Sequence, residues 1–119
     1  MVKKIKKTSG IALSGRISIK VDAKTLLGKG RIELLERIKE TGSVRKAAMQ
    51  MGMSYRKAWF AIDTINKLTA NTYVVLHRGG KAGSNATITD IAEKAIVFYK
   101  AATEKLELFL KEQTKEIKF

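Results

Sequence analysis

The sequence predicts a mainly α-helical domain that carries one small β-hairpin. The chain has 119 residues, of which 45% are hydrophobic, and this suits one compact domain with a packed core. Apolar residues recur at helical spacing in four stretches between residues 30 and 112. Two short apolar runs flank a glycine-rich loop near residue 80, as in a hairpin.

A strand is expected first, over residues 11–21. Apolar and polar residues alternate there from Leu13 onward, although Gly15 weakens the pattern. The first predicted helix covers residues 30–41, where a line of apolar residues shares one face with charged residues around the rest.

A short helix and a longer one follow, joined by tight turns. Gly42 stands where a glycine commonly ends a helix, and Ser43 is a good N-cap for a second helix that reaches Met51. Gly52 breaks that helix, and Ser54 caps a third helix that runs to about Lys67. These turns predict a helix-to-helix corner.

The second and third predicted helices have the residues that two helices need in order to cross steeply at a short turn. Ala48 is small where the two backbones approach, and Gly52, four positions later, tolerates a positive φ at the corner. Strands over 73–77 and 86–89 then form the hairpin. Together this order predicts a winged helix-turn-helix.

The last helix is expected from Asp90 to about Glu112, with Asp90 and Glu93 in a capping arrangement. Domain boundaries follow: a flexible basic arm over residues 1–10, the winged helix-turn-helix over 11–89, and a dimerisation helix with its tail over 90–119.

The charge points to a polyanionic partner. The net charge is +13, and all of the excess lies in residues 1–88, because residues 89–119 contain six basic and six acidic residues. DNA, RNA and an acidic membrane surface are the classes of partner to consider. No apolar stretch approaches the roughly 18 residues needed to span a bilayer, so we expect no membrane partner and a cytoplasmic protein.

Catalysis is a poor hypothesis for this chain. There is no cysteine, and the single histidine, His77, cannot build a zinc site alone. Asp63 and Glu40 are available acids, but no nucleophile, paired base or metal set accompanies them. We therefore expect no enzyme activity, no metal and no cofactor.

The second helix of a helix-turn-helix lies in the major groove, and its N-terminal residues contact base edges. The candidate DNA-binding residues of this unit are Arg45, Ser54, Tyr55, Arg56, Lys57, Thr64 and Lys67. Arg56 is suited to a bidentate contact with guanine, whereas Lys57 and Arg45 are suited to phosphates. The alternative is that Arg56 and Lys57 are only a solvated face, and contact is favoured for Arg56 because the basic pair falls at the helix start. Tyr55 and Trp59 share the apolar stripe and are interpreted chiefly as core anchors. In the wing, Arg78 and Lys81 can contact the phosphate backbone or the minor groove, although an ordinary loop is an equal alternative.

At this point the sequence resembles a known family. The run Met53–Trp59 followed by Ile62 and Asn66 is similar to the recognition helix of ModE-type regulators, molybdenum-responsive transcription factors with a LysR-like winged helix. The resemblance covers roughly residues 28–110 and includes the turn and the wing. It implies that Ser54 to Lys57 belong to the DNA-reading element and Lys81 to the wing. Family members commonly continue into a molybdate-binding domain, which we do not expect here.

The last helix is also expected to pair two copies of the chain. A helix of about 22 residues is roughly 33 Å long, too long for so small a body to cover. The candidate dimer-interface residues are Phe98, Ala102, Leu106, Phe109 and Leu110. A twofold dimer places two recognition helices about 34 Å apart, which fits an inverted-repeat operator.

The sequence therefore predicts a homodimeric, sequence-specific regulator that binds double-stranded DNA, alone or under a separate effector or regulatory protein. A nucleoid-type architectural protein with little base preference is the main alternative. An RNA-binding module is less favoured, because no aromatic-studded sheet is evident.

Overall fold

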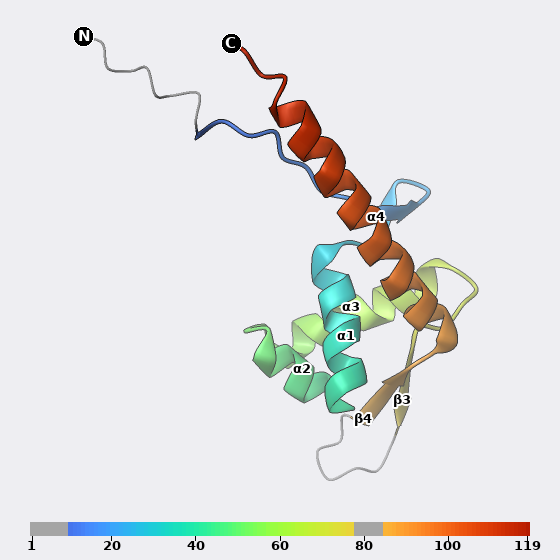
Figure 1. The fold of residues 1–119 in the computed structure, drawn as a ribbon. Helices are drawn as coiled ribbons and strands as arrows, with labels where there is room; N and C mark the ends of the chain where they lie inside the picture. Colours follow the sequence, from blue (N-terminus) through green and yellow to red (C-terminus); the bar gives the residue numbers. More distant parts are fainter. Residues whose placement is uncertain (1–9, 78–84) are drawn as a thin grey trace.

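A computed structural model describes residues 10–77 and 85–119 of the chain. Four helices and two small hairpins make up this part (Figure 1). In chain order the elements are β1 (Ile19–Val21), β2 (Lys24–Leu27), α1 (Lys29–Thr41), α2 (Val44–Gln50), α3 (Tyr55–Leu68), β3 (Val74–His77), β4 (Asn85–Ile88) and α4 (Asp90–Thr114). The mainly α fold with a small wing and a long last helix is as predicted.

Helix α1 lies at the centre of the core. Its buried side chains are Ile32, Leu34, Leu35 and Ile38, so two sides of the helix are covered. Helices α2 and α4 and strand β4 all contact it. These four residues are the apolar positions that the sequence predicts on one face, and Leu34 widens that face so that more than one side of the helix is buried.

The corner between α1 and α2 forms as predicted. Gly42 follows α1 with a φ of 70°, in the left-handed region, and its N–H donates to the carbonyl of Ile38 at 2.8 Å. The Ser43 hydroxyl then accepts the N–H of Lys46 at 3.1 Å and caps α2. Glycine adopts the left-handed conformation without the penalty that a Cβ imposes, so Gly42 ends the helix at low cost.

The second turn also has the predicted geometry. Gly52 has a φ of 68°, and the N–H of Met53 donates to the carbonyl of Ala48 at 3.0 Å. Ala48 is buried between the helices, where a larger side chain would separate them. Helices α2 and α3 therefore form a helix-turn-helix.

The wing is joined to that corner through the backbone. Strands β3 and β4 pair antiparallel, with Val74 opposite Ile88 and His77 opposite Asn85. The N–H of Ala86 donates to the carbonyl of Gly42 at 2.9 Å, next to a bridge between Ser43 and Asn85. The short link between α1 and α2 thus acts as a third, one-residue strand beside the hairpin.

The strand predicted over residues 11–21 is wrong for most of its length. Only Ile19–Val21 is a strand within that range, and it pairs with β2, which is not among the predicted strands. Residues 11–18 instead run alongside α4 (Figure 1). The hydroxyl of Tyr99 donates to the carbonyl of Ile17 at 2.8 Å. Alternation predicted an extended chain correctly, but a helix and not a strand lies beside it.

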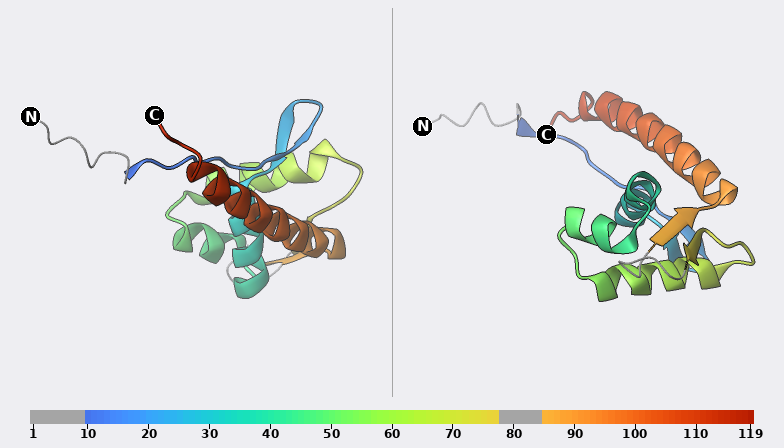
Figure 2. Two further views of the ribbon diagram at one scale, coloured as in Figure 1. Left: turned by 45° about the horizontal axis from the view of Figure 1, so that its top comes forward. Right: turned by 90° about the horizontal axis from the view of Figure 1, so that it is seen from below.

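Helix α4 begins in the core and then leaves it. Its cap is Thr89, one residue before the predicted Asp90, because the Thr89 side chain accepts the N–H of Ala92. Ala92, Ile96 and Tyr99 are buried against the body. The second half of the helix projects away from the body, as two further views make clear (Figure 2).

Candidate nucleic-acid interface

Helix α3 presents a clear outer face. Ala58, Ile62 and Ile65 are its buried residues, and they fix which side packs on the core. Because successive residues turn by about 100°, the opposite side is occupied by Arg56, Phe60 and Lys67. All three of these side chains are exposed.

The first turn of α3 carries the predicted basic pair. The Ser54 hydroxyl accepts the N–H of Lys57 at 3.0 Å and caps the helix. Arg56 and Lys57 are both exposed at this end. The helix N-terminus has a partial positive charge of its own, so two cations here create a strong preference for an anion.

Arg45 of α2 lies beside the same turn. Its guanidinium carbon is 4.5 Å from the centre of the Tyr55 ring, a cation–π contact that joins the start of α2 to the start of α3. Tyr55 is half-buried and packs against the core, so its predicted part as an anchor is confirmed. The contact adds a further cation to the exposed end of α3.

Farther along α3, the two remaining candidates are engaged within the helix. The Thr64 hydroxyl donates to the carbonyl of Phe60 at 3.0 Å, and Lys67 forms an ion pair with Asp63 at 3.1 Å. The pair lies at the surface, with the Lys67 side chain 73% exposed, so its contribution to stability is small and Lys67 can exchange Asp63 for a phosphate.

Two aromatic side chains beside the basic turn, Trp59 and Phe60, are more exposed than a place in the core would make them. The interpretation of Trp59 as a core anchor is wrong, since 43% of this residue is exposed. It lies about 100° around the helix from Ala58, at the edge of the buried stripe. Phe60 is 66% exposed, and sequence reasoning gave it no place. Both residues line an open hollow of about 480 Å³ together with Ser54, Arg56 and Lys57.

A side-chain clasp holds the end of α3 against the wing. The Asn66 carbonyl oxygen accepts the N–H of Tyr73 at 2.8 Å and that of Val74 at 3.1 Å, while its amide donates to the carbonyl of Val74 at 2.9 Å. This half-buried residue fixes the orientation of α3 relative to β3. The wing candidates Arg78 and Lys81 lie outside the described residues.

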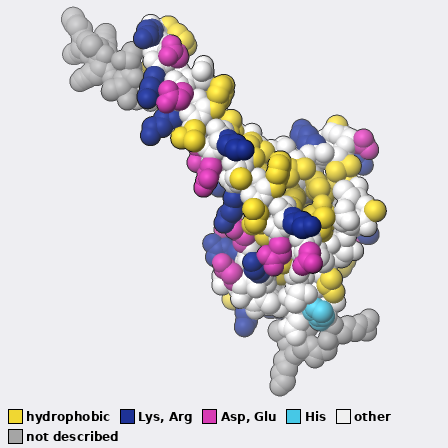
Figure 3. Space-filling view, turned by 45° about the vertical axis from the view of Figure 1, so that its right-hand side comes forward, with side chains coloured by type: hydrophobic (Ala, Val, Ile, Leu, Met, Phe, Trp, Pro, Cys, Tyr) yellow, Lys and Arg dark blue, Asp and Glu magenta, His cyan; other side chains and the backbone are white. Residues whose placement is uncertain are grey.

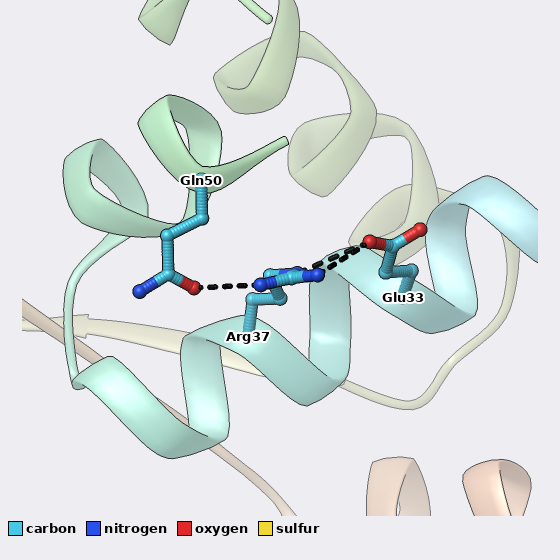
Figure 4. Close-up of polar contacts among 3 residues, drawn as sticks. All are labelled: Glu33, Arg37 and Gln50. Carbon is cyan, nitrogen blue, oxygen red and sulfur yellow. Dashed lines mark hydrogen bonds and ion pairs between the residues drawn. The ribbon is translucent and has the colours of Figure 1, made fainter. Parts of the chain in front are cut away.

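A second polar cluster links α1 to α2. Arg37 bonds to Glu33 one turn earlier, at 3.0 Å, and to the side-chain oxygen of Gln50 near the end of α2, at 3.0 Å (Figure 4). Glu33–Arg37 is a favourable pair at the i,i+4 spacing on α1. The added contact to Gln50, visible only in the fold, ties the two helices together at a point remote from the corner.

The candidate dimer-interface residues differ in exposure and in the side of α4 on which they lie. Phe98 and Phe109 are 63% and 56% exposed, and Ala102 and Leu106 are half-buried. Leu110 is half-buried on the side of α4 that faces the chain's own N-terminal segment, where a Cβ on Gly15 would lie 3.9 Å from it. Hydrophobic side chains alternate with charged ones along the projecting helix (Figure 3).

A metal site and a membrane-spanning helix each have requirements that can be checked against the described residues. Within residues 10–77 and 85–119, no group of acidic or histidine side chains is arranged to hold a metal ion. In the same described part, no helix is both long and apolar enough to cross a membrane.

No family model matches this chain, but comparison with known proteins finds relatives that are named for ModE or for molybdenum. The molybdenum transport protein ModE of Azotobacter vinelandii is 40% identical over 86 residues, 72% of this chain and 32% of that protein. The DNA-binding transcriptional dual regulator ModE of Escherichia coli strain K12 is 34% identical over 83 residues, 70% of this chain and 32% of the relative. The molybdenum-pterin-binding protein MopB of Rhodobacter capsulatus is 41% identical over 75 residues, 63% of this chain and 28% of the relative.

The chain thus spans about a third of the length of these relatives. The resemblance seen in the recognition helix is confirmed: this chain is homologous to the ModE-type regulators, and the part that it matches is a ModE-type DNA-binding domain.

Proposed function

We propose that this chain is a sequence-specific transcriptional regulator that binds double-stranded DNA as a homodimer on an inverted-repeat operator. The observation that carries the proposal is the outer face of α3. It presents Arg56 and Lys57 at a capped helix start, on a helix-turn-helix whose relative in Escherichia coli is named a DNA-binding regulator. A helix so presented fits the major groove with its N-terminal residues toward the base edges.

The division of labour within the surface follows from side-chain chemistry. Arg56 has the planar fork that matches the two acceptors of guanine, so it is assigned to base reading. Lys57 and Arg45 flank it and are assigned to phosphates, with Lys67 contributing once it leaves Asp63. Phosphate contacts set the register, and Arg56 then selects the sequence.

The homodimer is proposed from the exposed apolar side of α4. Phe98 and Phe109 are separated by three helical turns on one side of the helix, and both are largely exposed. Pairing two such helices would remove this apolar surface from water. The equal numbers of acidic and basic residues in 89–119 allow the approach, which an excess of one sign would oppose.

Control by a separate effector or regulatory protein is part of the same proposal. The molybdenum function named for the relatives is not part of it, because the matched segment is only about a third of their length. Base reading and phosphate contact are proposed for the helix-turn-helix and its wing, and pairing is proposed for the last helix.

The test is selection from a random double-stranded DNA library at near-physiological salt, followed by sequencing of the bound fraction. An enriched inverted repeat, with half-sites about one helical turn apart, supports the proposal. Binding without an enriched motif would instead favour an architectural protein. Absence of binding to duplex DNA, with retention of structured RNA in a parallel selection, would move the assignment to RNA.

A further inference from the structure

Phe60 occupies the middle of the face that α3 turns outward. It lies about 200° around the helix from the buried Ile62, and 66% of it is exposed. Arg56 precedes it by four residues and Thr64 follows it by four, so the three side chains form one line along the helix. An aromatic ring therefore stands between residues assigned to DNA.

The surroundings of Phe60 are unusual for an exposed apolar group. It shares an open hollow with Trp59, which is also exposed, and the other walls of that hollow include Arg56 and Lys57. The two cations that line the hollow favour a polyanion, while the two aromatic rings favour an apolar group. The partner must therefore present both kinds of chemistry within one helical turn.

Double-stranded DNA offers one apolar group at the base edges of its major groove, the C5-methyl group of thymine, and phenylalanine is among the side chains that contact it. We propose that Phe60, with Trp59 beside it, reads thymine through this methyl group. The inference rests on the proposed function and adds a second specificity-determining position to the one assigned to Arg56.

Helical geometry also sets where that thymine should lie. Four residues of helix rise about 6 Å, and successive bases of one strand are about 3.4 Å apart along the duplex axis. The thymine contacted by Phe60 is thus expected within about two base steps of the guanine contacted by Arg56. An operator half-site should contain both bases at that separation.

The experiment uses the duplex enriched in the library selection. Each thymine of a half-site is replaced in turn by uracil, which keeps the base pair and removes only the methyl group. Burying one methyl-sized group is worth roughly a fourfold change in affinity. We expect at least one uracil duplex to bind the wild-type protein about fourfold more weakly, and the Phe60→Ala protein to bind the thymine and uracil forms equally.

Two further variants sharpen the result. The loss of affinity that follows replacement of thymine by uracil is called here the uracil penalty. Phe60→Leu keeps an apolar contact with the methyl group and should retain part of this penalty. Met49→Ala removes another exposed apolar side chain, from the preceding helix, and should retain all of it.

Three results would overturn the inference. The first is that the wild-type protein binds every uracil duplex as tightly as the thymine duplex. This result would overturn the inference about Phe60 but would not contradict the proposed function. The second is an undiminished uracil penalty in the Phe60→Ala protein. It would overturn the inference because another residue would then contact the methyl group. The third is a library selection that enriches no motif. It would contradict both the proposed function and the inference about Phe60, which rests on it.

Discussion

Arg56 and Lys57 are adjacent on the first turn of α3, yet their assigned roles differ. Replacing Arg56 by alanine should cost about 1–3 kcal/mol at the preferred site and relax the preference at one base position, because the bidentate contact to guanine is lost. Replacing Lys57 by alanine should weaken binding to all sequences similarly and lower the slope of log affinity against log salt by about 1.

Both variants can be compared by repeating the library selection and by titrating the enriched duplex and a scrambled duplex at several salt concentrations. Lys57→Ala is the matched control for Arg56→Ala, since each removes one positive charge from the same turn. If Arg56→Ala leaves the enriched motif unchanged, the assignment of base reading to Arg56 is wrong.

Ala23 shows a local conflict between residue type and backbone. It lies in the turn between β1 and β2 with a φ of 70°, and Asp22 before it has a φ of 47°. A left-handed conformation costs a non-glycine residue roughly 1–2 kcal/mol, so replacing alanine by glycine removes this cost. Glycine also increases the conformational entropy of the unfolded chain, which offsets part of the stabilisation. Ala23→Gly should therefore raise the free energy of unfolding by about 0.5 kcal/mol.

Urea denaturation at constant m-value measures that change. Ala70→Gly is the control, because Ala70 is an exposed loop residue outside the positive-φ region. This control should leave stability unchanged or lower it. A loss of stability in Ala23→Gly equal to that in the control would contradict the account of the turn.

Among the elements, the joint between α3 and the wing depends on one side chain. Asn66 makes three hydrogen bonds to the backbone of Tyr73 and Val74. Asn66→Ala leaves these partly buried backbone groups without that partner, so we expect a loss of about 2 kcal/mol in the free energy of unfolding. Asn66→Asp keeps the acceptor for the two N–H groups but loses the donor, and it should recover part of the loss.

Thermal and urea unfolding followed by circular dichroism would check both variants. Asn71→Ala, at an exposed position in the same loop, serves as the control and should change stability by less than about 0.5 kcal/mol. Full stability in Asn66→Ala would show that the clasp is not what orients α3 relative to β3.

At the scale of the whole molecule, the projecting helix carries the proposal of a dimer. Phe98→Glu or Phe109→Glu would place a carboxylate in the apolar contact between two copies, where an unpaired charge is costly to bury. Either change should convert the dimer to a monomer at micromolar concentration. Monomers should in turn bind a single half-site and lose the preference for inverted repeats.

Light scattering coupled to size-exclusion chromatography gives the mass directly. Phe119→Glu makes the same substitution at an exposed aromatic residue beyond the end of α4, and it should leave the mass unchanged. A wild-type protein that is already monomeric at this concentration, or a Phe98→Glu protein that remains dimeric, would exclude the proposed use of this surface.

Local signals were enough to predict the helix-turn-helix and the hairpin. Gly42 and Gly52 occupy left-handed positions, and Ser43 and Ser54 cap their helices, because these features depend on a few neighbouring residues. The same is true of the exposed basic turn at Arg56. Roles that depend on distant contacts were not accessible: Asn66 is recognisable as a clasp only once β3 is beside it.

The sequence by itself determined the order of the four helices and the wing, the glycine turns between the first three helices and the concentration of positive charge ahead of α4, since each follows from spacing, cap chemistry and composition. Tertiary structure decided what covers each face. It placed α4 and not a strand partner beside residues 11–18, left Trp59 and Phe60 exposed beside the basic turn, and turned Leu110 toward Gly15. Periodicity shows which residues share a side of an element, but the neighbour that covers that side is chosen by packing across the whole chain.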